Sequence, residues 1–120
     1  MPLEKVCVYA VADVKIYHDV KTACTHLGGI PIKIESILEN AFAFSRIEEF
    51  HGIGGYIGVV KHLNGDWTYA DGTVLKYQNW APNEPNNKPL FDCTHMEPTT
   101  GKWESTECFI PRPYFCSVHV

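Results

Sequence analysis

Hydrophobic positions in the first half of the chain change their spacing from one segment to the next, and each spacing predicts an element. Residues 6–14 are mostly apolar and read as an opening strand. In residues 16–27 the apolar side chains fall at helical spacing, which predicts an amphipathic helix with Cys24 on its buried face. Gly28 and Gly29 follow and are expected to end this helix.

A second strand and helix follow the first pair. Residues 30–34 alternate in the manner of a strand, and Ser36 with Glu39 forms a capping box that predicts a helix up to about Phe50. Residues 56–60 are rich in strand-forming side chains and carry no charge. They predict a central strand that is buried on both faces.

Short strands and turns dominate the second half. The dipeptides Asn64-Gly65 and Asp71-Gly72 predict turns on either side of a three-residue strand at 67–69. More short strands are expected around residues 91–96, 102–103 and 114–118. Two helices followed by many short antiparallel strands predict an α+β domain.

Residues 79–90 predict a long surface loop, because prolines and asparagines alternate there without an apolar period. Glu84 and Asn86 place a carboxylate and an amide carbonyl on the same side of an extended chain. Such a pair can hold a hard cation or accept hydrogen bonds from sugar hydroxyls, although an ordinary surface turn has the same composition. Trp80 and Trp103 are expected in the core beside the loop.

Length and charge exclude several classes of protein. The 120 residues suit a single domain, residues 1–120. A formal net charge of −4 argues against a nucleic-acid partner, and no apolar run is long enough for insertion into a membrane. The six histidines have no paired spacing, and no catalytic arrangement is visible, so we expect solvated or singly hydrogen-bonded histidines and no enzyme activity.

The cysteines indicate an oxidising environment. They are Cys7, Cys24, Cys93, Cys108 and Cys116. No CxxC pair occurs, so a zinc site is not expected, and an extracellular setting is predicted, either as a secreted protein or as the ectodomain of a larger one. An odd number leaves one thiol unpaired or bonded outside this chain.

In order along the chain, these motifs resemble the C-type lectin domain over essentially the whole length. The residues that carry the resemblance are Tyr17–Cys24, Leu27–Gly29, Glu39–Ala41, Tyr56–Val59, Trp67–Tyr69, Asp71–Gly72, Asn79–Trp80, Glu84–Asn86, Asp92–Cys93, Gly101–Trp103, Cys108 and Tyr114–Cys116. The resemblance implies a C-type lectin-like fold, with two helices packed on short antiparallel sheets and a long loop region.

The resemblance also implies two disulfides, Cys24–Cys116 and Cys93–Cys108. Cys7 is then unpaired or bonded externally. It would join a cysteine upstream in a larger parent chain, stay free, or link two copies in a dimer.

The calcium site that the resemblance implies is matched only in part. Glu84 and Asn86 stand in the Glu-Pro-Asn motif, in the order associated with mannose-type sugars and with a cis Glu84–Pro85 bond in the occupied site. Phe91 replaces an acidic residue, and Glu104-Ser105 replaces an Asn-Asp pair. Calcium takes six to eight oxygen ligands, so a weak site is expected. The metal ligands expected are Glu84, Asn86 and Glu104, together with Asp92, which is either a secondary ligand or, beside Cys93, the partner of a structural hydrogen bond. The ligand-binding residues are Glu84, Asn86, Asn87, Glu104 and Ser105.

Two functions from different classes follow. The first is an extracellular module that binds a glycan or glycoprotein, with a mannose-type preference and a calcium dependence that is weak or lost. The second is a calcium-independent module that binds a protein ligand and no sugar. Phe91 and Ser105 favour the second function, whereas the intact Glu84-Pro85-Asn86 motif favours the first. Of the two, we expect the first function, glycan recognition.

Overall fold

The structure is a computed structural model that describes residues 6–119. Its elements are β1 (Val6–Lys15), α1 (Tyr17–His26), β2 (Ile30–Pro31), α2 (Ile37–Phe44), the 3-10 helix η1 (Ile47–Phe50), β3 (Gly55–Ile57), β4 (Val59–Lys61), β5 (Trp67–Tyr69), β6 (Cys93–Met96), β7 (Trp103–Thr106) and β8 (Arg112–His119). This order of helices and short strands confirms the α+β prediction.

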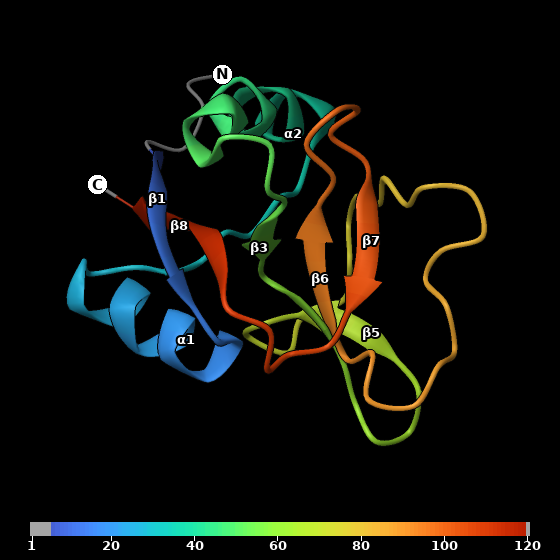
Figure 1. Ribbon diagram of the computed structural model, residues 1–120. Coiled ribbons are helices and arrows are strands. Elements are labelled where there is room, and N and C mark those ends of the chain that lie inside the picture. The colour runs from blue at the N-terminus through green and yellow to red at the C-terminus, as the bar shows by residue number, and fades with distance from the viewer. Residues whose placement is uncertain (1–5, 120) are drawn as a thin grey trace.

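Two sheets organise the chain. The main sheet has the order β1-β8-β3-β6-β7, with β2 also paired to β8, and the second sheet contains only β4 and β5. All of these pairs are antiparallel except β3 with β8. Figure 1 shows α1 beside β1 and β8, and the long segment between β5 and β6 extending outward past β7. The loop predicted at 79–90 therefore lies beside an edge strand.

Hydrogen bonds in the core hold β7, the strand beside that loop, in place. The Trp103 side chain is fully buried, and its indole N–H donates to Asn40 Oδ1 of α2 at 2.8 Å. The amide of Asn40 in turn donates to the Gly101 carbonyl at 3.1 Å. A buried polar side chain is stable when its hydrogen bonds are made, and here they tie α2 to the start of β7.

Two disulfides join distant parts of the chain. Cys24 of α1 is bonded to Cys116 of β8, and Cys93 of β6 is bonded to Cys108. These are the pairs that the resemblance implies. Cys7 is exposed on β1 and belongs to neither disulfide.

The strand predicted at residues 56–60 is central and buried as expected at Tyr56 and Ile57, but its continuation to residue 60 as a single strand is wrong. Gly58 separates β3, which lies between β8 and β6, from β4, which belongs to the other sheet. Gly58 donates its N–H to the Ile32 carbonyl at 2.8 Å, and a Cβ at this position would lie 2.5 Å from the Pro31 carbonyl oxygen. The chain therefore turns between sheets at a point where only glycine allows so close an approach of two backbones.

Two other predicted elements are shorter than expected. Ser36 does cap α2, because its hydroxyl accepts from the Glu39 N–H at 3.2 Å, but the helix ends at Phe44 and η1 is separate. The Ser45 hydroxyl donates to the Phe42 carbonyl, which gives that carbonyl a partner outside the helical ladder. The strand predicted at 30–34 is only the two residues of β2, because the Lys33 N–H donates to the Ser117 hydroxyl.

Candidate functional site

The start of the loop is hydrogen-bonded to the outer edge of β7. The Trp103 N–H donates to the Asn79 carbonyl at 2.8 Å, and the Ala81 N–H donates to the Trp103 carbonyl at 2.9 Å. The Trp80 ring packs edge-on against that of Trp103, with 5.5 Å between their centroids. These contacts confirm that both indoles belong to the core region, and they bring the next residues of the loop to Ser105.

Glu84 is held against β7 by Ser105. Its Oε1 accepts from the Ser105 N–H at 2.9 Å, from the Ser105 hydroxyl at 2.6 Å and from the Asn86 N–H at 3.2 Å. Burial by itself raises the pKa of Glu84, but the hydrogen bonds from Ser105 and Asn86 outweigh it and hold this pKa below its usual value. Glu84 is therefore an ionised carboxylate at neutral pH, with protein donors already in place.

Asn86 and Asn87 continue the loop next to this carboxylate. The Asn86 Oδ1 accepts from the Lys88 N–H at 3.0 Å, and the Asn86 Nδ2 lies 3.5 Å from Glu84 Oε2. The Asn87 side chain is exposed. The Glu84–Pro85 peptide bond is cis. Four of the ligand-binding residues predicted from the sequence, Glu84, Asn86, Asn87 and Ser105, thus lie in one neighbourhood.

Glu104 is turned towards a different partner. Its Oε1 lies 3.2 Å from the Nε2 of His95, the residue directly opposite on β6. Burial, assisted by the Arg112 charge, lowers the pKa of His95 to about 4, so the ring is uncharged at neutral pH. Burial raises the pKa of Glu104, and the nearby carboxylates of Glu97 and Glu84 raise it further. His95 is thus mostly buried and singly paired, and sequence patterns do not reveal this because the contact depends on strand register.

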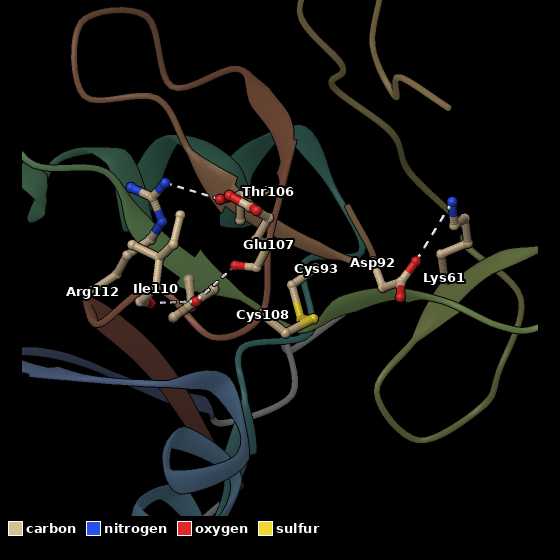
Figure 2. Close-up of a disulfide and its surroundings, with 9 residues drawn as sticks. Lys61, Asp92, Cys93, Thr106, Glu107, Cys108, Ile110 and Arg112 are labelled. Carbon is tan, nitrogen blue, oxygen red and sulfur yellow. Dashed lines mark hydrogen bonds and ion pairs between the residues drawn. A yellow bond between two sulfur atoms is a disulfide. The ribbon is translucent and has the colours of Figure 1, made fainter. Parts of the chain in front are cut away.

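Asp92 forms an ion pair with Lys61. Asp92 Oδ1 lies 3.5 Å from Lys61 Nζ, and the Asp92 carbonyl accepts from the Lys61 N–H at 2.9 Å. Figure 2 shows this pair beside the Cys93–Cys108 disulfide. Lys61, His62, Leu63 and Asp92 line an open hollow of about 360 Å³. Sequence reasoning missed Lys61, and a lone lysine in a strand carries no signal that would have identified it.

The residues as arranged do not fit a calcium site. Within residues 6–119, no three His, Cys, Asp or Glu side chains gather as metal ligands would. Glu84 accepts from Ser105, Glu104 contacts His95, and Asp92 contacts Lys61, so the predicted ligands face different partners. Calcium ligation by Glu84, Asn86, Glu104 and Asp92 stays a prediction.

The fold and the loop define a domain in which a disulfide-bonded scaffold carries a long polar loop at its surface. The chain belongs to the lectin C-type domain family, whose model matches residues 13–118. Domains of this family are in general binding modules rather than enzymes, they generally recognise carbohydrate, and they commonly use calcium. No helix within residues 6–119 has the length and apolar character needed to cross a membrane.

Proteins with similar sequences are consistent with membership of this family. A perlucin-like protein of Mytilus galloprovincialis is 30% identical over 107 residues, which are 85% of this chain and 69% of that protein. Pulmonary surfactant-associated protein D of Sus scrofa is 31% identical over 107 residues, 85% of this chain but only 28% of its own length. C-type mannose receptor 2 of Homo sapiens is 28% identical over 119 residues, 96% of this chain and 8% of the receptor. This chain thus spans about two thirds of the mussel protein and much smaller parts of the other two.

Solved structures show the same fold. Human lithostathine superposes with a TM-score of 0.89 at 21% identity, covering 100% of this chain and 96% of its own. The carbohydrate-recognition domain of cow CD23, determined in the presence of a GlcNAc2Man3 oligosaccharide, gives 0.86 at 27% identity, covering 100% and 92%. A calcium-independent type II antifreeze protein gives 0.86 at 21% identity, covering 99% and 90%. These likenesses confirm the C-type lectin-like fold.

Proposed function

We propose that this chain is an extracellular carbohydrate-recognition module of one domain, residues 1–120, whose calcium dependence is weak or lost. The observation that carries the proposal is the position of Glu84 and Asn86, side by side next to the edge of β7, with Ser105 fixing the carboxylate. A carboxylate accepts and an amide both donates and accepts, which is what adjacent sugar hydroxyls require.

Three further observations support this proposal. Asn87 is exposed next to the pair and can add a donor and an acceptor. The cow CD23 domain of the same fold was determined with an oligosaccharide, and another relative is a mannose receptor by name. Two disulfides suit an extracellular location, secreted or in an ectodomain. The Glu-before-Asn order of the motif favours mannose-type over galactose-type sugars.

A second function, binding of a protein ligand without sugar recognition, is favoured by the other end of the loop. Leu90 is 62% exposed, and the adjacent Phe91 ring lies 5.6 Å from the Lys88 ammonium. An apolar side chain beside an aromatic ring and a cation is a surface that suits a protein partner better than a sugar. The same fold occurs in an antifreeze protein, so the fold alone does not choose between the two.

Binding of mannose and galactose glycans on an array, in calcium and again in EDTA, tests the proposal. We expect mannose-type glycans to bind in both buffers and Asn86→Ala to weaken them by roughly tenfold, the value of one polar contact. Asn64→Ala, in the turn between β4 and β5, is the matched control and should bind like the wild type. Absence of glycan binding in both buffers refutes the proposal and favours the protein ligand.

A further inference from the structure

The segment from Glu84 to Asp92 is fixed at both ends by a carboxylate. At its first end, Glu84 accepts from the N–H and the hydroxyl of Ser105 on β7. At its second end, Asp92 contacts both the backbone and the ammonium of Lys61 on β4. Since β4 and β7 belong to different sheets, these two contacts attach the loop to both halves of the scaffold.

The attachment at Lys61 is built from several contacts. The Lys61 side chain is only 18% exposed, and its Nζ lies 5.9 Å from the centre of the Trp67 ring as well as 3.5 Å from Asp92 Oδ1. The next residue after Asp92 is Cys93, a buried half-cystine that anchors the backbone (Figure 2). The backbone at Asp92 is therefore held close to Lys61, within reach of its ammonium.

The loop between these ends is closed by its own contacts. The Phe91 N–H donates to the Lys88 carbonyl at 3.2 Å, and the Lys88 N–H donates to Asn86 Oδ1 at 3.0 Å. Short turns of this kind fix the backbone locally but do not attach it to the scaffold. The attachment comes from the two ends, where Glu84 and the Asn86 N–H contact Ser105 and where Asp92 contacts Lys61.

We infer that Lys61 is a positioning residue that acts as an internal cation, holding the Asp92 end of the recognition loop so that the loop is preformed without a metal ion. A divalent cation entering the hollow beside Asp92 would meet the Lys61 ammonium in its lining, and like charges repel. Lys61 neutralises Asp92, and Ser105 satisfies Glu84, so both ends are held by protein groups. That the preformed loop binds sugars rests on the function proposed above. That Lys61 holds the loop in place is independent of that function.

Hydrogen exchange of the backbone amides of residues 86–91, except Pro89, which has no N–H, tests this inference when it is measured without ligand in EDTA and in about 5 mM calcium. We expect the wild type to exchange equally in both buffers. Lys61→Met should exchange faster by roughly two- to fivefold, which is the scale of a partly exposed ion pair. Lys61→Arg keeps the charge and should restore slow exchange. The matched control is Lys76→Met, which removes a lysine paired with Glu35 and leaves the Asp92 pair intact.

Two results would overturn the inference. One is slower exchange of the wild-type loop in calcium, which means that a metal holds it. The other is exchange in Lys61→Met no faster than in Lys76→Met, which means that the ion pair does not hold the loop. Addition of Asp92→Asn to Lys61→Met should have little further effect if the two residues act as a pair. Because no ligand is present, a loop that behaves as expected while binding no glycan would count against the proposed function alone.

Discussion

Replacing Ser105 with alanine tests how the loop is attached to β7. The Ser105 side chain is buried, its hydroxyl donates to Glu84 Oε1 at 2.6 Å, and its oxygen also accepts from the Asn86 N–H at 3.1 Å. A hydrogen bond to a charged group contributes about 1.5–3 kcal/mol to stability. Water reaches part of Glu84, so we expect Ser105→Ala to lower the free energy of unfolding by about 1–2 kcal/mol at neutral pH.

The effect of this substitution should depend on pH with a definite sign. The pKa of Glu84 is lowered in the folded protein, so the stability linked to it is present above the unfolded pKa of about 4.3 and is lost as the pH falls through the folded value. Once Glu84 is protonated, only a neutral hydrogen bond remains to be lost. The difference between wild type and Ser105→Ala should therefore shrink to about 0.5–1 kcal/mol once the pH has fallen below the folded pKa of Glu84.

Urea unfolding of both proteins across this pH range is the measurement. Other carboxylates with lowered pKa values, such as Asp71 and Glu97, titrate in both proteins and cancel in the difference. Ser45→Ala is the control, because the Ser45 hydroxyl donates to an uncharged carbonyl and should give a small, pH-independent effect. A difference for Ser105→Ala that is the same at neutral and acid pH would show that Glu84 does not depend on Ser105.

Three shorter predictions concern the backbone, the metal and the thiols. Gly58→Ala should destabilise the protein by about 1–3 kcal/mol in urea unfolding, since its Cβ would lie 2.5 Å from the Pro31 carbonyl oxygen, and an unchanged midpoint would contradict this close approach. Phe91→Glu combined with Ser105→Asp adds two carboxylates and should make the melting temperature rise in several millimolar calcium; no rise would mean that these positions do not converge. A peptide map under non-reducing conditions should show the two disulfides of the structure with Cys7 in neither, and a Cys7 peptide linked to another cysteine of the chain would contradict that pairing.

The sequence predicted well the features that depend on local signals. The helix at α1 follows from the spacing of apolar residues, the start of α2 from Ser36 and Glu39, and the strand at β5 from its flanking turns. The disulfides and the cis bond at Glu84–Pro85 came with the resemblance, not from local signals. The division of residues 56–60 was missed, because it depends on the approach of a backbone 26 or 27 residues away in the sequence, at Pro31 and Ile32.

The side-chain partners of the site were also beyond sequence reasoning. The contact of Glu104 with His95 exists because those two residues stand opposite each other on β6 and β7, and that register is not visible in the motif. The contact of Lys61 with Asp92 joins β4 of the second sheet to the residue that directly precedes β6 of the main sheet. Nothing local to Lys61 distinguishes it from a solvated lysine, so only the folded arrangement identifies it.

These partners change the meaning of the substitutions in the calcium motif. From the sequence alone, Phe91 and Ser105 stand where the calcium motif implied by the resemblance has two acidic residues. Without those two carboxylates, the remaining acidic residues would lack the ion that neutralises them in that motif. In the structure each of the three acidic residues contacts a protein group: the uncharged Ser105 and His95 contact Glu84 and Glu104, and the Lys61 cation contacts Asp92. A calcium ion would compete with these groups for the carboxylates, and this cost subtracts from its affinity. A loop held in this way needs no metal to keep its shape, which is why weak or absent calcium dependence is consistent with an intact Glu84-Pro85-Asn86 motif.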